Sequence, residues 1–489
     1  MSAKASESIE PVPAKFRFTF EDVSLPANEK MGLLGTTLLF DTNDWLSLGV
    51  GAYGALSGQR GGFITLGGAA EASLPLHEYV EIASGVFVGA GGGHSGYTLS
   101  GGGLMLRFHA GARVKTMLGD FGAGISYLDF PDGAIHSSQP YFSYEYPFYT
   151  ILDSGWRELP PRSAGFMTAS RMGEQELAPV YRHYIIPAGV LTDAGTPQHR
   201  YIDLMGIEWN RYIDDNWFIH VETEGAMRGK SNGYMQILFG GGFRYKLFDG
   251  TRLKLSSSVG VAGGGNVATG GGFIVDAVAS LQQRLGEHLY AEFSGGFVRV
   301  PSTSFKATSI AGKLGYHFFT PDASDDNPRE VAELSGFEAE HFRLRFGGQH
   351  YFKGAADWRT HHANLDVDLL GVQADWFVHP NIYLTGQGLA AATGMAGAYM
   401  TGLFGAGVHL PLFDLPLFID AEGLAGAAGG GGMAVGGGLV WQTNAGFGYQ
   451  FSDALAAIAQ FGYIAAPRGT FRAKVATVSL AYSFSLFMK

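Results

Sequence analysis

The sequence contains no cysteine among its 489 residues, which excludes disulfides, thiolate metal sites and cysteine nucleophiles. Charged residues are scarce, at 16%, yet no apolar run reaches the roughly 18–20 residues that a membrane-spanning helix needs. The net charge of −11 argues against nonspecific nucleic-acid binding, because such binding depends on Lys and Arg side chains that neutralise phosphates. These absences exclude a disulfide scaffold, a helical membrane bundle and a general nucleic-acid binder.

Glycine is abundant, with 74 residues, and two sets of landmarks indicate that the chain repeats itself. Each landmark of the first set is a glycine after an apolar pair: Gly35, Gly206 and Gly371. Their spacings are 206 − 35 = 171 and 371 − 206 = 165. The same offsets separate the landmarks of the second set: Leu76, Leu247 and Leu412. A shared offset at separate landmarks predicts three copies of one structural unit.

Within one copy, apolar and polar residues alternate with a period of two, which is the pattern of β-strands. The segment LMLRFHAGARVK at 104–115 shows this alternation over its whole length. The first copy is expected to hold eight strands, at 16–21, 32–40, 45–56, 62–76, 80–90, 103–118, 121–130 and 139–148. Three such copies predict 24 strands.

The predicted turns fall into two alternating sets. One set is short and polar, as at 41–44, 118–120 and 248–250. The other is longer and rich in glycine, as at 89–103, 262–272 and 427–438. Soluble β-sandwiches or a propeller-like array are the alternative interpretation. The asymmetry of the turns, together with strands near the roughly ten residues that cross a bilayer at a tilt, favours a transmembrane antiparallel β-barrel.

The chain resembles bacterial outer-membrane β-barrel proteins in these strands, in these turns and in its last strand, KVATVSLAYSF. That strand, with Tyr482 and Phe484, is similar to the C-terminal assembly signal of the class, although the chain continues to Ser-Leu-Phe-Met-Lys. One copy alone resembles a small OmpA-like or OmpW-like eight-stranded barrel. The resemblance implies a bacterial outer-membrane location. No signal peptide is visible in MSAKASESIEPVPAK, so a removed signal is expected.

The three copies could close as one barrel of about 24 strands or as three separate eight-stranded barrels. The single barrel is the expectation, because the inward face carries small residues and charged residues without an evident partner, which suit a wet lumen. Its backbone diameter would be near 45–50 Å. The expected divisions are a flexible N-terminal segment at 1–15, repeats at 16–148, 181–319 and 341–489, and periplasmic-side insertions at 149–180 and 320–340.

Inward-facing charged residues are the candidate site. Two readings stay open: a lumen field that guides an anionic solute, or wall charges that pair across strands. Four basic residues that flank the turn at 248–250 are expected to cluster near the periplasmic mouth. The full set predicted to line a pore is Arg107, His109, Arg113, Lys115, His220, Glu222, Glu224, Arg244, Lys246, Arg252, Lys254, Glu292, Arg343 and Arg345.

The expected function is a wide outer-membrane conduit for a large hydrophilic cargo, such as an exported polymer or a protein segment. The first alternative is a non-conducting scaffold whose lumen is filled by a partner protein, and the second is a lipid-modifying enzyme. No catalytic set can be chosen from the sequence, so the protein is expected not to be an enzyme. No cofactor or metal site is predicted. Outer-membrane lipid and a periplasmic or lumen-filling protein are the expected partners.

Overall fold

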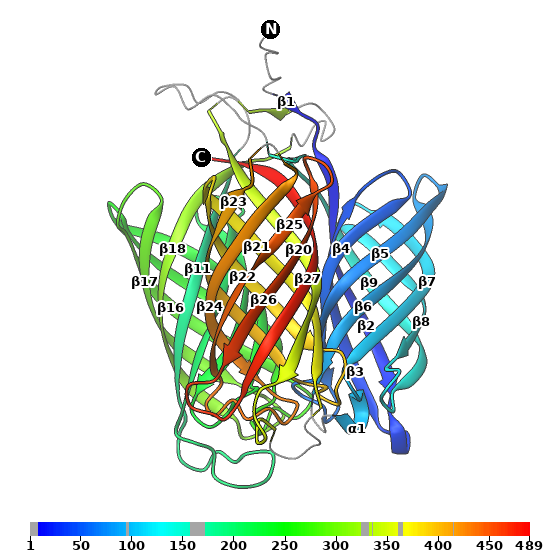
Figure 1. Ribbon diagram of the computed structural model, residues 1–489, viewed down its shortest axis with the longest axis vertical. Helices are drawn as coiled ribbons and strands as arrows, with labels where there is room; N and C mark the ends of the chain where they lie inside the picture. Colours follow the sequence, from blue (N-terminus) through cyan, green and yellow to red (C-terminus); the bar gives the residue numbers. More distant parts are fainter. Residues whose placement is uncertain are drawn as a thin grey trace.

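The computed structural model describes residues 8–93, 97–156, 172–323, 332–334, 336–359, 365–413 and 415–489, and these form antiparallel strands almost throughout (Figure 1). The strands close into three separate eight-stranded barrels. The expected single barrel of 24 strands is therefore wrong, whereas its alternative and the all-β antiparallel class are confirmed. No helix in the described ranges is long and apolar enough to span a bilayer.

Each barrel closes because its last strand pairs with its own first strand. Barrel 1 consists of β2 (Val12–Ser24), β3 (Lys30–Asp41), β4 (Leu46–Ser57), β5 (Ile64–His77), β6 (Val80–Gly92), β7 (Leu104–Thr116), β8 (Gly119–Asp129) and β9 (His136–Thr150). Barrel 2 consists of β11 (Met172–Ile185), β12 (Tyr201–Tyr212), β13 (Trp217–Arg228), β14 (Met235–Phe248), β15 (Thr251–Gly263), β16 (Phe273–Arg284), β17 (Leu289–Arg299) and β18 (Lys306–Pro321).

Barrel 3 repeats the same plan at the C-terminal end of the chain. It consists of β20 (Glu338–Lys353), β21 (Val367–His379), β22 (Ile382–Ala391), β23 (Met400–Pro411), β24 (Leu417–Gly429), β25 (Leu439–Gln450), β26 (Leu455–Ala465) and β27 (Arg472–Met488). The second strands of barrels 1 and 2 begin 201 − 30 = 171 positions apart, which is the offset of the sequence landmarks.

The small inward-facing residues make room for large aromatic side chains, whereas they were expected to border a wide, wet lumen. A Cβ atom on Gly35 would overlap the ring of Tyr53, and one on Gly242 would meet the ring of Phe218. Large aromatic side chains thus lie over glycines of the neighbouring strand. Narrow barrels are filled by pairing small and large side chains in this way, so the glycines do not mark a wide lumen.

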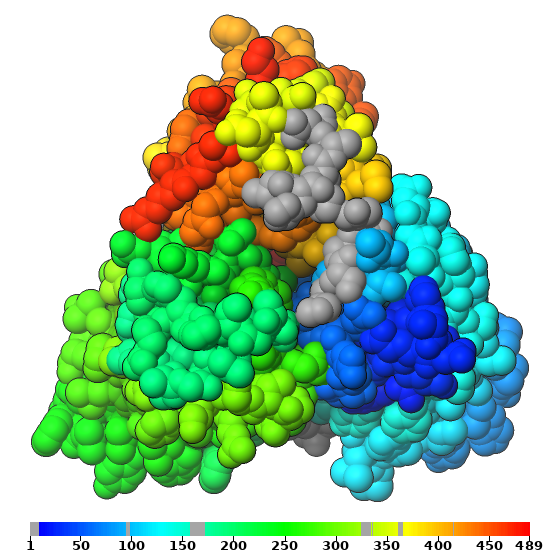
Figure 2. All heavy atoms as spheres, turned by 90° about the horizontal axis from the view of Figure 1, so that it is seen from below, coloured from blue at the N-terminus to red at the C-terminus, as the bar shows by residue number. Residues whose placement is uncertain are grey.

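The barrels stand at the corners of a triangle, as the view onto the Gly-rich loops shows (Figure 2). The loop between the third and fourth strands of each barrel contacts the loop between the fifth and sixth strands of the next barrel. The contacting loops are β4–β5 with β15–β16, β13–β14 with β24–β25, and β22–β23 with β6–β7. The interfaces therefore follow a pseudo-threefold, head-to-tail ring.

Glycine is required where these loops meet, because backbone packs directly on backbone. The amide of Gly61 donates to the carbonyl oxygen of Gly270 at 2.7 Å, across the interface of barrels 1 and 2. A Cβ on Gly62 would overlap the backbone of Gly264, and one on Gly429 would overlap that of Gly233. Apolar side chains of all three barrels pack beside these loops in one buried cluster, here called the axial cluster: Ile64, Ala90, Ile237, Val261, Ala390, Ala392 and Met400.

At the opposite, short-turn end, segments outside the barrels tie them together (Figure 1). Strand β1 (Ser8–Ile9) pairs with β19 (Ala332–Glu333), and β10 (Leu152–Ser154) pairs with the end of β27. A buried apolar cluster gathers here: Ile9, Ile151, Leu334, Phe337 and Phe487. Of the expected N-terminal segment and insertions, residues 1–7, 157–171, 324–331 and 335 lie outside the described residues.

Candidate functional site: the three barrel interiors

The interior of barrel 1 is built around the buried carboxylate of Glu71 on β5. It accepts bonds from Arg17 Nη2 at 2.6 Å, Arg113 Nη1 at 2.8 Å and His109 Nε2 at 3.0 Å. Arg17 also donates through Nε to Glu145 at 2.6 Å. Strands β2 and β5 are not neighbours in the barrel, so these bonds cross the lumen.

Two further predicted residues of barrel 1 are also partnered. Arg107 Nε lies 2.9 Å from Glu21 Oε1, and both side chains are almost fully buried. Lys115 lies nearer the short-turn end, where its side chain is 47% exposed and its Nζ is 3.3 Å from Glu81. Of the predicted positions in this barrel, Lys115 is therefore the one that meets solvent.

Barrel 2 holds an alternating chain of lysines and carboxylates. Lys254 Nζ lies 3.1 Å from Glu176 and 3.0 Å from Glu292. Lys313 Nζ continues the chain, at 2.8 Å from Glu292 and 2.6 Å from Glu208. Two lysines thus lie among three carboxylates, so each of these buried charges has a partner of opposite sign.

A second network in barrel 2 contains the remaining inward residues of the prediction. Arg182 bonds to Glu222 and, through Nε at 2.9 Å, to Glu224. His220 Nε2 lies 2.6 Å from the hydroxyl of Ser258. Glu222 and Glu224, which were both predicted, therefore accept from the same buried guanidinium group, that of Arg182.

The predicted basic cluster near the turn at 248–250 forms only in part. Arg244 and Arg252 share Glu174, with Nη1 atoms 2.5 Å and 3.3 Å from its Oε1. Lys254 lies deeper, in the lysine–carboxylate chain. Lys246 lies opposite Arg252 in the register, but its side chain is 68% exposed and pairs with Asp249 at 2.5 Å rather than with Glu174. The prediction missed Glu174, which brings the two arginines together.

In barrel 3, Asp375 lies between two arginines. Arg343 Nε and Arg345 Nε both donate to Asp375 Oδ2 at 2.7 Å. Arg343 also reaches Asp420 at 2.8 Å, and Arg345 reaches Glu422 at 2.8 Å. These partners come from β21 and β24, so the network again spans the lumen.

Toward the Gly-rich loops, the side chains inside each barrel change from charged to apolar. In barrel 3 this layer includes Trp358, Tyr399 and Phe471, with no more than 1% of each side chain exposed. Barrel 1 has Phe63 and Phe130 at this end, and barrel 2 has its own buried cluster. Every lumen therefore carries a charged layer closed by side-chain pairing and an apolar layer that excludes water.

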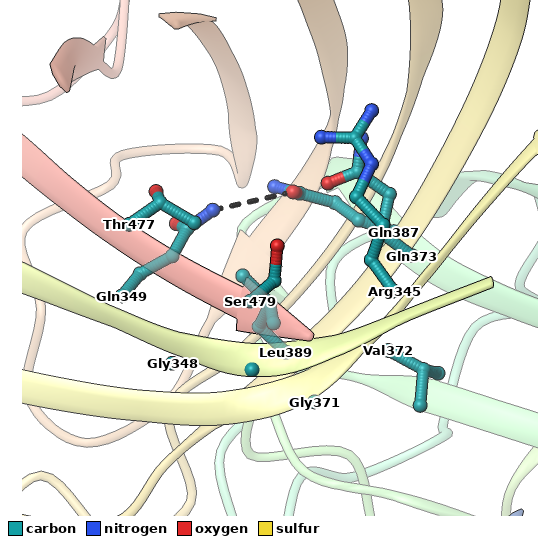
Figure 3. A pocket seen from close by; sticks show the side chains of 11 residues that line it. Arg345, Gly348, Gln349, Gly371, Val372, Gln373, Gln387, Leu389, Thr477 and Ser479 are labelled. Atoms are coloured by element: carbon teal, nitrogen blue, oxygen red, sulfur yellow. Dashed lines mark hydrogen bonds between the residues drawn. The ribbon is translucent and has the colours of Figure 1, made fainter. Parts of the chain in front are cut away.

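A small cavity lies in barrel 3 between these two layers (Figure 3), with about 20 Å³ open to the centre of a water-sized sphere, which is room for about one water molecule. Its lining is mostly neutral and combines glycine and aliphatic residues with glutamine, threonine and serine. One bond across it joins Gln349 Nε2 to Gln387 Oε1 at 3.3 Å. The residues around it are Arg345, Gly347, Gly348, Gln349, Gly371, Val372, Gln373, Gln387, Leu389, Thr477 and Ser479.

The short-turn mouth of barrel 3 is covered by a side chain from the segment that follows barrel 1. Trp156 comes directly after β10 and stacks on His341, with ring centroids 5.3 Å apart and planes 4° apart. Its ring is 4.5 Å from that of Phe377, and its Nε1 donates to the carbonyl oxygen of Phe342 at 3.1 Å. In the sequence, Trp156 falls within an expected insertion, and no local pattern assigns it this role.

All 14 predicted residues are placed, and the structure gives each of them a partner. The inward charges, for which the sequence shows no evident partner, are paired in the structure. Whether any of the 14 lines a conducting path stays a prediction. The residues that the prediction missed share a simple signal, because they carry charge on the inward parity of the same copy: Arg17, Glu21, Glu145, Glu174, Glu176, Arg182, Glu208, Lys313, Asp375, Asp420 and Glu422. Within the described ranges, no group of His, Asp and Glu side chains is placed to hold a metal ion.

The outer surfaces of the barrels are apolar where they face away from one another. Phe108, Ile125, Phe293, Phe461 and Val478 are each at least 48% exposed on this surface. Exposed aromatic residues stand beside the short turns: Trp45, Tyr79, Trp217 and Tyr245. An apolar band with aromatic residues at its edge is what a lipid bilayer selects. Fold and surface together define a membrane β-barrel protein of the outer-membrane class.

No protein-family model and no curated protein match this sequence. Among solved structures, it is similar to the siderophore receptor PirA from Pseudomonas aeruginosa, with 10% identity and a TM-score of 0.26 over 97% of this chain and 80% of that chain. It is also similar to OccK11 (OpdR) from Pseudomonas aeruginosa, with 13% identity and a TM-score of 0.20 over 98% of this chain and 96% of that chain. Because TM-scores this low carry no argument, the function of the chain is inferred from its own geometry.

Proposed function

We propose that this protein is an outer-membrane scaffold in which three sealed barrels are held as one rigid, non-conducting body. The observation that carries the proposal is the filling of the lumens, where buried arginines and lysines bond across each barrel to carboxylates such as Glu71, Glu292 and Asp375. An ion that enters such a lumen would have to break these pairs and then cross an apolar layer. Both steps are costly for a charged species.

The conduit for a large cargo depended on a lumen that the chain does not form. That lumen needed strand eight of one copy to pair with strand one of the next, whereas β9 pairs with β2 and β18 pairs with β11. The axial cluster also closes the space between barrels at the Gly-rich end. The scaffold therefore replaces the wide conduit as the proposal.

The outer-membrane location is part of the proposal. An even number of antiparallel strands, short turns at one end and longer loops at the other are typical of outer-membrane barrels. Each barrel of this chain has these features. The short-turn end, which also holds β1 and the C-terminus in Figure 1, would then face the periplasm.

Planar-bilayer recording of the purified protein tests the proposal. We expect no steady conductance above the bare bilayer at moderate voltage, because each lumen is sealed by ion pairs. A large, stable conductance in many independent insertions would contradict the scaffold. A Glu71→Gln/Glu145→Gln variant of barrel 1 is the positive control, since loss of both carboxylates should loosen the seal.

Passage of small uncharged solutes through barrel 3 is the second candidate. The specific observation in its favour is the cavity bounded by Gln349, Gln387 and Ser479, in which neutral polar groups replace charges. Liposome swelling in isotonic solutions of small polyols would measure such passage. Swelling that a bulky Ser479→Leu substitution abolishes would favour this candidate, whereas swelling at the rate of protein-free liposomes would exclude it.

A further inference from the structure

The levels that border the cavity in barrel 3 are built from different side chains in barrels 1 and 2. Strand register makes Ser479 of β27 equivalent to Ser143 of barrel 1 and to Lys313 of barrel 2, since all three face the same position of the first strand. In barrel 2 this position is occupied by a long ammonium side chain that bonds to two carboxylates. In barrels 1 and 3 it holds only the hydroxymethyl group of a serine, so the neighbouring level decides how barrels 1 and 3 differ.

The neighbouring level loses volume relative to barrel 1, whereas barrel 2 holds the small Ala311 there. Thr477 is equivalent to Tyr141 of barrel 1, whose ring lies 5.3 Å from the Arg107 guanidinium. Arg107 in turn bonds to Glu21, and the equivalent of Glu21 in barrel 3 is the neutral Gln349. Barrel 3 therefore replaces a tyrosine and an ion pair by a threonine and a glutamine.

Polar atoms that face this space lack protein partners. Thr477 Oγ1 and Ser479 Oγ line the cavity, and neither has a hydrogen-bond partner among the described residues, although the two residues are only 8% and 6% exposed. In the same barrel, Thr401 Oγ1 and Gln460 Nε2 are also buried without a partner in the described part of the chain. Buried hydroxyl and amide groups of this kind normally bond to ordered water.

The lining also defines the chemistry of an occupant. The one charged side chain of the lining, Arg345, is already bonded to Asp375 and Glu422. The groups that remain are amides and hydroxyls, which can both donate and accept hydrogen bonds. Such a site favours a small neutral molecule over an ion, because an ion would find no free counter-charge.

We propose that this cavity is an internal site for water and for neutral polar molecules of similar size, and that it exchanges with bulk solvent. Thr477 and Ser479 supply hydroxyl groups on β27, the amide of Gln349 lies beside Thr477, and the amides of Gln373 and Gln387 lie across the space (Figure 3). In barrel 1, Tyr141 and the Arg107–Glu21 pair occupy the level of Thr477, which makes barrel 1 the matched comparison. The proposed site goes beyond the scaffold role, which requires only that ions do not pass.

The absence of cysteine from the chain gives a direct test. Ser479→Cys places a single thiol in the cavity, and Ser143→Cys places one at the equivalent level of barrel 1. Each folded variant, checked by heat-modifiable gel migration, is treated with hydrogen peroxide, an uncharged molecule little larger than water that oxidises cysteine to the sulfenic acid. Mass spectrometry follows the modified fraction over time.

We expect the thiol of Ser479→Cys to react at least about tenfold faster than that of Ser143→Cys, because thiol reactivity requires hydration and access. Equal rates in the two folded variants would overturn the proposal. If Ser479→Cys does not fold, Thr477→Cys probes the same cavity with the same prediction. Conductance measurements are independent of this result, so failure of the hydrated site and failure of the scaffold are distinguishable.

Discussion

The interfaces between the barrels are alike, whereas the barrel interiors differ. Each interface joins the same two loops of the unit, and glycines stand where the backbones touch. Inside, Arg17 and Arg345 occupy equivalent positions, but Arg17 bonds to carboxylates on β5 and β9 and Arg345 to carboxylates on β21 and β24. Barrel 2 has Ala178 at that level. Where backbone packs on backbone, few residues other than glycine fit. The inside of a barrel, in contrast, can be built from different side chains as long as they fill the volume and balance the charge.

The largest expected effect comes from removing a carboxylate that several cations share. Glu71→Gln leaves Arg17 and Arg113 with one fewer counter-charge in a buried site, which should lower the free energy of unfolding by about 3–5 kcal/mol. Glu422→Gln in barrel 3 should cost clearly less, since Glu422 accepts from Arg345 and otherwise from neutral donors such as Gln373. Urea unfolding in detergent, followed by gel migration, measures both. Equal losses would contradict the difference between the interiors.

An interface glycine should show the next largest effect. Gly62 has φ +85° and a Cβ there would overlap the backbone of Gly264, whereas Gly189 has φ +88° and no atom within 4 Å of an added Cβ. Both Ala variants strain a left-handed backbone, but only Gly62→Ala also forces two barrels apart. We expect Gly62→Ala to cost about 2–4 kcal/mol and Gly189→Ala about 1 kcal/mol.

Thermal unfolding of the two glycine variants separates the cost of a strained left-handed backbone from the cost of disturbing the contact between barrels. A similar fall in the unfolding midpoint for both would show that the loop contact contributes little. A larger fall for Gly62→Ala would locate the added cost at the interface of barrels 1 and 2. Limited proteolysis of the loops provides a second readout, because a parted interface exposes loop backbone.

Trp156 tests whether a segment outside the barrels stabilises one interior. Trp156→Ala removes the stacking on His341 and the bond to the Phe342 carbonyl oxygen, and should lower stability by about 2 kcal/mol. Hydrogen exchange should then rise at the short-turn end of barrel 3 and stay unchanged in barrel 2. Trp217→Phe, at an exposed turn of barrel 2, is the control. A uniform rise over all three barrels would contradict a local role.

The smallest effect is expected at a turn that the three copies build differently. Equivalent positions hold Asn43, Asp214 and His379, and each side chain accepts from backbone amides of its turn. The backbone N–H groups of Trp217 and Asn216 hold the pKa of Asp214 below its usual range. The stabilisation is therefore present above the ordinary Asp pKa of about 4 and is lost as the pH falls through the lowered value.

Asp214→Asn should remove this pH dependence, because an amide does not titrate. Circular dichroism at increasing acidity would compare the thermal midpoints of the two proteins. We expect the difference between them to vary as the pH falls below about 4 and to be constant above it. A constant difference over the whole range would show that the ionisation of Asp214 does not affect stability.

The strands, the antiparallel pairing and the two kinds of turn could be predicted because each depends on local sequence. A period of two fixes which side chains share a face, and this placed residues such as Arg107 and Arg345 inward. Closure could not be predicted in the same way. The strand sequences are compatible with pairing β9 to β2 or to β11, and only the completed interior distinguishes the two.

The interior itself is decided by contacts between residues far apart in the chain. Arg17 meets Glu145 across 128 positions, and Lys254 meets Glu176 across 78. Counting charges on the inward parity of one copy would have found these partners, since each barrel contains both signs. The cavity in barrel 3 depends on the total volume of side chains from several strands, and this total cannot be predicted from any local sequence pattern.

The covalent link between the three barrels has an evolutionary consequence. In a ring of identical subunits, every substitution appears three times, so an interior that loses a tyrosine loses it in all copies. Here one gene encodes each position once, and Thr477 can differ from its counterparts without touching Tyr141. Fusion thus frees one barrel to diverge while its two neighbours keep the assembly intact.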